Sequence, residues 1–92
     1  MMPSRDPKEL QAVGQRLRTA RKALGLSQKE LYDSLGVGAS TWHNWESGKR
    51  LPDPLVMAQL RKVYGVTLDW VFAGETAGIS RSLEQKMMEG AG

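Results

Sequence analysis

Apolar residues recur every three or four positions along most of this chain, which is the spacing of one buried face on an α-helix. The clearest stripe consists of Leu10, Val13, Leu17, Ala20 and Leu24. Shorter stripes of the same kind follow it, and no segment alternates convincingly between apolar and polar residues as a half-buried strand does. The pattern predicts an all-α fold, a compact bundle of about five short helices.

Residues that cap or end helices divide this pattern into five elements. Asp6 is a capping residue before the first helix, and Gly25 suits the left-handed position that ends it. The second helix begins with Ser27-Gln28-Lys29-Glu30, a capping-box sequence, and ends at Gly36. The remaining helices are predicted over about 38–47, 53–64 and 68–73, and each is followed by a glycine.

The segment 75–92 differs from the rest of the chain because it contains several glycines and only a weak apolar pattern of Ile79, Leu83 and Met87. Isolated short helices are marginal in water, so this composition favours a loose tail. The alternative is a short helix that docks on the domain or binds a partner or a second copy. We therefore predict a helical domain over residues 1–74 and a tail over residues 75–92.

Composition sets further limits on the kind of protein. The chain has 92 residues, which suits one domain, and it has no cysteine, which excludes disulfides and thiolate metal sites. No stretch approaches the roughly 18 apolar residues of a membrane span, and the N-terminus lacks an apolar signal region. We therefore expect a cytoplasmic protein that does not contact a membrane.

Residues suited to catalysis or metal binding are sparse. His43 is the single histidine, so it has no partner for a histidine-based metal site or a catalytic dyad. The acidic residues show no pairing that suggests acid–base chemistry. We therefore expect no enzyme activity, no metal and no cofactor.

The net charge is +3, from 13 basic and 10 acidic residues, and it is unevenly distributed. Residues 14–50 contain seven basic and three acidic residues, a balance of +4, whereas residues 51–92 contain four and five, a balance of −1. A positive front half is typical of a nucleic-acid-binding face, although a solvated helix surface has the same charge. The same two interpretations apply to the basic cluster of Arg16, Arg18, Arg21 and Lys22.

The second and third predicted helices, joined by Leu35-Gly36-Val37-Gly38, form the most informative unit, over about residues 28–47. A tight turn at Gly36 would set them at a steep angle, so that the third helix can enter a DNA major groove. Small polar side chains on one face of that helix suit contacts with base edges. They are Ser40, His43, Asn44 and Ser47, with Ala39 at the leading end. His43 also has a second interpretation, as an ordinary surface residue.

The tryptophans are predicted to anchor helices to the core. Trp42 and Trp45 are three residues apart and share the face of the third helix opposite the polar one. Stacking on bases is the minor alternative, because proteins that read duplex DNA seldom need it. In the fifth helix Val71 and Phe72 are expected to face inward, and Trp70 is either a core residue or a dimer contact.

Several segments between residues 13 and 74 follow a known pattern. They are Arg16-Leu17-Arg18, Leu24-Gly25-Leu26-Ser27-Gln28-Lys29-Glu30-Leu31, Leu35-Gly36-Val37, Ser40-Thr41-Trp42, Trp45-Glu46-Ser47-Gly48-Lys49-Arg50 and Leu68-Asp69-Trp70. In these segments the chain resembles the Cro/C1-type helix-turn-helix family of phage repressors and their bacterial relatives, which is also described as XRE-like or lambda-repressor-like. The resemblance covers about two thirds of the chain.

The resemblance implies roles for individual residues. Positions that usually read bases are matched by Ala39, Ser40 and Asn44. Positions that usually contact the DNA backbone are matched by Gln28, Thr41, Ser47, Lys49 and Arg50. Arg21 and Glu46 match a pair that forms a salt bridge between the first and third helices, which would also orient Arg21 towards a phosphate.

The chain departs from the family pattern near the crossing of the second and third helices. Tyr32 stands where a small residue is preferred, and Trp42 stands where an aliphatic residue is usual. Two large aromatic residues here predict either a wider crossing or a Tyr32 ring that leans towards solvent. Gly38 replaces the usual Ser or Thr cap, which costs a few tenths of a kcal/mol.

The resemblance implies a sequence-specific transcriptional regulator that binds double-stranded DNA. A repressor is favoured because no effector domain is evident, and a homodimer on a two-fold operator is expected because one module reads few bases. Two alternatives remain open, an antitoxin-type autoregulator with a protein partner on its tail, and an adaptor that keeps the fold without DNA binding. Gln28, Asn44 and Lys49 argue against the adaptor, which has no reason to keep them.

Overall fold

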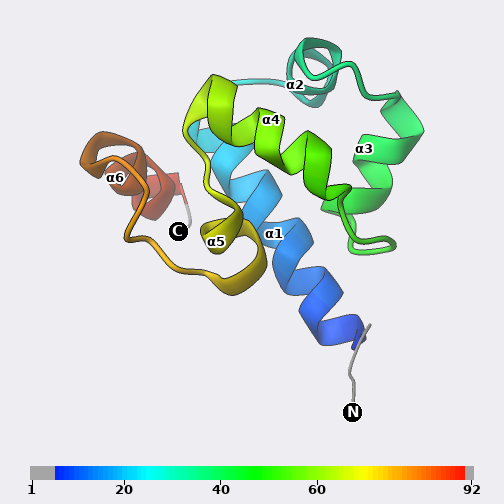
Figure 1. Cartoon of the computed structure of the whole chain (residues 1–92), viewed down its shortest axis with the longest axis horizontal. Coiled ribbons are helices and arrows are strands. Elements are labelled where there is room, and N and C mark those ends of the chain that lie inside the picture. The colour runs from blue at the N-terminus through cyan, green and yellow to red at the C-terminus, as the bar shows by residue number, and fades with distance from the viewer. Residues whose placement is uncertain (1–5, 91–92) are drawn as a thin grey trace.

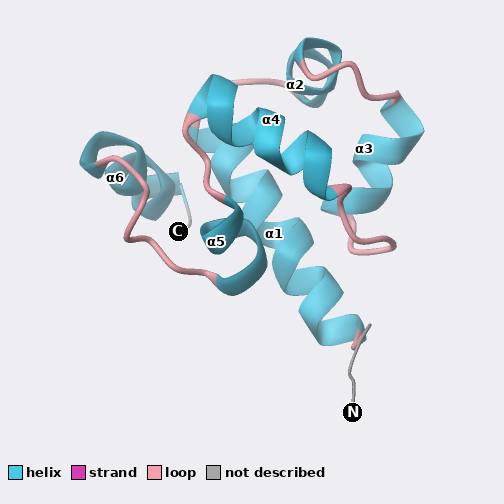
Figure 2. Cartoon of the chain, in the orientation of Figure 1, coloured by secondary structure: helices cyan, strands magenta, loops and turns pink. Residues whose placement is uncertain are grey.

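A computed structural model describes residues 6–90 of the chain, and within that range it contains six helices and no strand (Figure 1). The helices are α1 (Pro7–Ala23), α2 (Gln28–Ser34), α3 (Ala39–Glu46), α4 (Pro54–Tyr64), α5 (Leu68–Ala73) and α6 (Arg81–Gly90). Figure 2 shows that short loops join them. None of these helices is long and apolar enough to cross a membrane. Residues 1–5 and 91–92, the outer ends of the predicted domain and tail, lie outside the described residues.

The all-α prediction is confirmed, and local signals explain where the helices begin. The Asp6 side chain accepts the amide of Lys8 at the start of α1. At α2 the capping box is complete, because Ser27 Oγ accepts the Glu30 amide and the Glu30 carboxylate accepts the Ser27 amide. Gly38 precedes α3 without a side-chain cap, as its identity predicts. Each side-chain cap stabilises a helix by about 1 kcal/mol, so local sequence determines most of these starts.

The core forms around one face of α1, which packs against α3, α5 and α6 (Figure 1). The stripe predicted for α1 faces this core through Val13, Leu17 and Ala20. Trp42 and Trp45 are also buried, and their rings meet edge to face with centroids 5.6 Å apart. The prediction that both tryptophans anchor α3 to the core is confirmed.

A glycine lets the backbones of α1 and α3 come into contact. A Cβ atom added at Gly14 would lie 2.5 Å from the carbonyl oxygen of Glu46 and 2.7 Å from that of Trp45. No side chain fits into that space unless one of the helices moves. Gly14 therefore sets how closely α3 approaches α1, a role that its place in the sequence does not reveal.

In α5 the structure corrects the predicted inner face. Phe72, which was expected to face inward, is 38% exposed, whereas Trp70 is buried and belongs to the core. Residues two apart on an α-helix point in nearly opposite directions, so a short helix on a surface buries only one of them. Trp70 occupies the inner position, which makes it a core residue.

The C-terminal segment forms a helix docked on α1, and the loose tail that its composition favours is wrong for the described residues. Ile79, Leu83 and Met87 are four residues apart, and all three are buried in the core to which α1 belongs. The side chain of Ser80 accepts the amide of Leu83 and caps the helix. Packing on α1 stabilises a helix too short to be stable alone, and the sequence of the segment does not reveal that surface.

Replacing a buried residue of α6 tests this docking. Leu83→Ala should lower the free energy of unfolding by roughly 2–4 kcal/mol, because it removes buried apolar surface and leaves a cavity beneath the helix. Met88→Ala is the matched control, since Met88 lies on the same helix but is 72% exposed. Its effect should stay within about 0.5 kcal/mol. Urea unfolding followed by circular dichroism measures both, and equally small effects would show that α6 does not dock.

Candidate nucleic-acid interface

A short turn joins α2 to α3, and the two helices pack against each other (Figure 1). Gly36 in this turn has a φ of 69°, a left-handed conformation that residues with a Cβ rarely adopt. The amide of Val37 then donates to the carbonyl of Tyr32. At the same C-terminal end of α2 the Tyr64 hydroxyl of α4 donates to Ser34 Oγ, at 2.7 Å. These contacts hold α2 in place, and α3 leaves it at a defined angle.

The outer face of α3 consists of small or uncharged side chains. They are Ala39, Ser40, Thr41, His43 and Asn44, of which only Asn44 is partly buried. The opposite face carries the two buried tryptophans, and the acidic residue of this helix, Glu46, also points inward. α3 therefore presents no negative charge on its outer face, and its backbone can approach another surface closely.

Most of the predicted contact residues of α2 and α3 line one shallow groove, whereas Thr41 and Ser47 are exposed outside it. Its lining consists of Ser27, Gln28, Lys29, Tyr32, Ala39, Ser40, His43 and Asn44. The fold thus brings Gln28 beside the candidate base-reading residues of α3. Tyr32 is partly buried, packs against the core and also lines this groove, which agrees with the second of the two alternatives, a ring that leans towards solvent.

The loop after α3 places two basic residues at the end of this surface. The amides of Lys49 and Arg50 donate to the carbonyl of Asn44, at 2.9 and 3.3 Å, so the loop folds back on the last turn of α3. The side chains of Ser47, Lys49 and Arg50 are exposed. The surface therefore combines an uncharged helix face with two flanking positive charges, which suits a polyanion.

The basic cluster of α1 divides into two kinds of residue. Arg16 donates from Nε to the carbonyl of Val71, at 2.8 Å, and so binds the last turn of α5. The Arg21 side chain also binds another residue of the protein, Glu46 of α3, whereas Arg18 and Lys22 are exposed. Neither a solvated face nor a DNA contact describes the whole cluster, because two of its members hold helices together.

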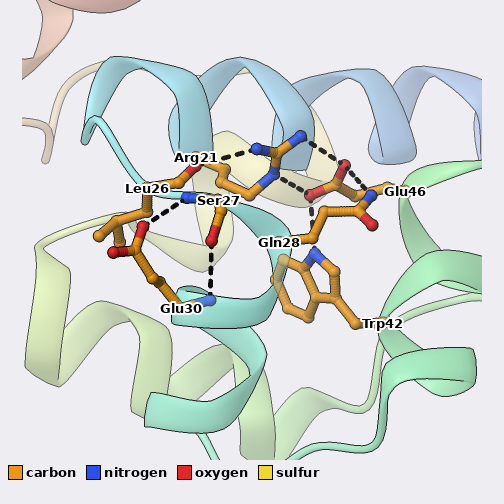
Figure 3. Close-up of polar contacts among 7 residues, drawn as sticks. All are labelled: Arg21, Leu26, Ser27, Gln28, Glu30, Trp42 and Glu46. Carbon is orange, nitrogen blue, oxygen red and sulfur yellow. Dashed lines mark hydrogen bonds and ion pairs between the residues drawn. The ribbon is translucent and has the colours of Figure 1, made fainter.

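A buried carboxylate links α1, α2 and α3. Figure 3 shows Arg21, Gln28 and Trp42 converging on Glu46. Oε2 of Glu46 accepts Arg21 Nε and Trp42 Nε1, both at 2.7 Å, and Oε1 accepts Gln28 Nε2 at 2.9 Å and Arg21 Nη2 at 3.2 Å. The ion pair that the resemblance predicts is confirmed. The contacts from Gln28 and Trp42 were not predicted, although residues four apart on a helix, such as Trp42 and Glu46, are neighbours.

These donors control the ionisation of Glu46. Burial alone would raise the pKa of its carboxyl, but hydrogen bonds from Arg21, Gln28 and Trp42, together with the charge of Arg21, outweigh burial and lower the pKa below its ordinary value. Arg21 also donates from Nη1 to the carbonyl of Leu26, at 2.9 Å. Because the Arg21 side chain is only 11% exposed, it has little surface to offer a phosphate.

Removing the charge of Glu46 should destabilise the fold strongly. Glu46→Gln should lower the free energy of unfolding by roughly 3–5 kcal/mol at neutral pH, because Arg21 then lacks a counter-ion. Since the pKa of Glu46 is lower in the folded than in the unfolded chain, its stabilising effect is present above the ordinary value of 4.5 and is lost as the pH falls through the folded value. Unfolding curves of both proteins over that range should therefore converge only in acid.

An exposed ion pair provides the matched control. Lys29 and Asp33 lie 2.7 Å apart on α2, but their side chains are 75% and 56% exposed. Asp33→Asn should change the free energy of unfolding by less than about 1 kcal/mol. If Glu46→Gln were as mild as this control, the carboxylate would not hold the helices together.

Comparison with known proteins agrees with this geometry. The family described as "Helix-turn-helix domain" matches residues 14–77. The HTH-type transcriptional regulator ImmR of Bacillus subtilis (strain 168) is 27% identical over 85 residues, covering 85% of this chain and 67% of that protein. The SPbeta prophage-derived uncharacterized HTH-type transcriptional regulator YonR, from the same organism, is 33% identical over 64 residues, covering 70% of this chain and 59% of that protein. No solved structure matches the chain significantly. The chain belongs to the helix-turn-helix domain family, of the Cro/C1 or XRE type.

Proposed function

We propose that the protein is a DNA-binding transcriptional regulator whose α3 reads base edges in the major groove. The observation that carries this proposal is the groove formed by α2 and α3, with its uncharged lining from α3 and the exposed Lys49 and Arg50 beside it. A B-DNA major groove is about 12 Å wide and accepts one helix. Small side chains allow that helix to approach closely, and the two cations at its C-terminal end can bind phosphates there.

The side chains divide between the two tasks. The proposed base contacts are Ala39, Ser40, His43 and Asn44. The proposed backbone contacts are Gln28, Thr41, Ser47, Lys49 and Arg50. Asn44 is the strongest candidate for specificity, because a carboxamide can form two hydrogen bonds with adenine, whereas the Ala39 methyl suits a thymine methyl.

The printed names of the two relatives describe transcriptional regulators, which supports the same class for this chain. We further propose that it acts as a repressor, as a dimer on a two-fold operator. One α3 reads too few base pairs for useful specificity, and two modules about 34 Å apart on the same side of the duplex supply the rest. A bound dimer then blocks a promoter by occupying it.

Sequence selection measures the proposed readout directly. From a random pool of duplexes at fixed salt, the native protein should enrich a two-fold symmetric site. Asn44→Ala should lose preference at one base pair of each half-site and bind the native operator more weakly by about 1–3 kcal/mol. Gln85→Ala, an exposed amide of α6, is the matched control and should select the native site. Equal retention of all duplexes by the native protein would overturn the proposed base readout, whereas retention of no duplex would favour the adaptor alternative.

Salt dependence separates backbone contacts from base contacts. Lys49→Ala should weaken binding to all duplexes alike and reduce the slope of log affinity against log salt by about 0.9, the value for one lost phosphate contact. Lys86→Ala, an exposed lysine of α6, removes the same charge from a helix remote from α3 (Figure 1). An equal loss of slope in both variants would mean that net charge, and not a contact at Lys49, drives binding.

A further inference from the structure

We propose that Trp42 is a positioning residue for DNA binding, because its indole N–H orients the Glu46 carboxylate that holds Gln28 at the DNA-facing groove. The inference rests on the proposed function, since it assigns Gln28 to a phosphate contact. Trp42 itself does not reach the surface, as its side chain is fully buried. It therefore acts on DNA only through Glu46 and Gln28.

The geometry defines a chain of two hydrogen bonds. Trp42 Nε1 donates to Glu46 Oε2 at 2.7 Å, and Glu46 Oε1 accepts Gln28 Nε2 at 2.9 Å (Figure 3). The two bonds use different oxygens of one carboxylate, so the position of one oxygen determines that of the other. Core packing holds the Trp42 ring, including its edge-to-face contact with Trp45, and this leaves the N–H a single direction.

Arg21 alone does not supply this constraint. Arg21 binds both oxygens of Glu46, from Nε at 2.7 Å and from Nη2 at 3.2 Å, but it belongs to α1 and therefore fixes the carboxylate relative to that helix. Trp42 and Glu46 instead lie on the same helix, one turn apart. The indole therefore fixes the carboxylate relative to α3, which is the helix proposed to enter the groove.

The chemistry of the carboxylate also fixes which way the Gln28 amide faces. An ionised carboxylate only accepts hydrogen bonds, so Gln28 must turn its NH₂ group, and not its carbonyl, towards Glu46. The NH₂ group carries a second hydrogen, and Gln28 lines the groove beside Ser40 and Asn44. That second hydrogen is available to an anion such as a phosphate oxygen. A side chain ordered in advance loses less conformational freedom on binding.

The alternative is that Trp42 only fills the core. A volume-filling role predicts that a variant without the N–H binds DNA normally as long as it stays folded. Trp70→Phe is the matched control, because Trp70 is buried in the same core but lies on α5, and its side chain is not among the hydrogen-bond partners of Glu46. Trp42→Phe and Trp70→Phe remove similar volumes from one core, and only the first removes a hydrogen bond to Glu46.

A double-mutant cycle on the full chain tests the proposal. Affinity for the selected operator is measured for the native protein, Trp42→Phe, Gln28→Ala and the double variant, below their unfolding temperatures. Trp42→Phe should weaken binding roughly three- to ten-fold, with the base preference unchanged. The double variant should bind no more weakly than Gln28→Ala alone, because both changes disable the same contact. Trp70→Phe should leave the affinity unchanged in either background.

Nuclear magnetic resonance without DNA provides a second readout. The side-chain NH₂ of Gln28 should give two well-separated proton signals in the native protein and in Trp70→Phe. In Trp42→Phe the two signals should move towards those of an exposed glutamine. If Trp42→Phe does not fold, β-(3-benzothienyl)alanine at position 42 keeps the bicyclic ring and replaces the N–H with sulfur.

The outcomes separate the two proposals. If the native protein selects no operator, the proposed function is wrong, and the Gln28 signals alone decide whether Trp42 orders that side chain. If it selects an operator but Trp42→Phe binds with native affinity, or the two changes act independently, Trp42 is only a core residue. Either of those results overturns the inference and leaves the proposed function intact.

Discussion

The arrangement of the first three helices depends on one buried negative charge. The Glu46 side chain is 4% exposed, and an ionised carboxylate at such depth is stable only when its oxygens are paired. Its donors come from α1, α2 and α3, so all three helices must meet correctly before the charge is satisfied. Gly14 permits this meeting, because any side chain there would push the end of α3 away from α1. Replacing a buried pair with apolar residues often preserves stability, so the value of the carboxylate lies in the single arrangement it selects.

The same charge explains why the outer face of α3 is uncharged. A short helix must anchor itself with its inner residues, and here two tryptophans and the one acidic side chain take that side. What remains outside is small, apart from the His43 ring, and neutral. Positive charge enters the surface from the following loop, whose amides bond back to Asn44. The eight residues of α3 therefore both attach the helix to the core and form its outer surface. A change on one face of so short a helix affects the other face.

Much of the fold could be predicted because helix ends are encoded locally. The capping box at Ser27 and the glycines after α1 to α5 need no knowledge of the rest of the chain. Features that depend on residues distant in sequence were missed or wrong. Docking of Ile79, Leu83 and Met87 requires a surface on α1, and the choice between Trp70 and Phe72 requires knowing which side of α5 meets the core. At the site, the pairing of Arg21 with Glu46 follows from family resemblance. The hydrogen bonds that Gln28 and Trp42 donate to Glu46 do not follow from that resemblance. A tryptophan on the inner face of a helix is expected to pack in the core, and its position does not predict a hydrogen bond.

Helix α6 packs on the side of α1 away from α3. α1 packs against α3 and α6, which flank it in Figure 1. Leu83 and Lys86 of α6 line a surface groove with Ala23 and Leu24, at the end of the turn of α1 that carries Arg21. In that turn the carbonyls of Arg21 and Lys22 accept the amides of Leu26 and Gly25, so α6 adds apolar contacts there and not hydrogen-bond partners. The C-terminal helix therefore packs against the helix that carries Arg21, on the side of α1 away from α3.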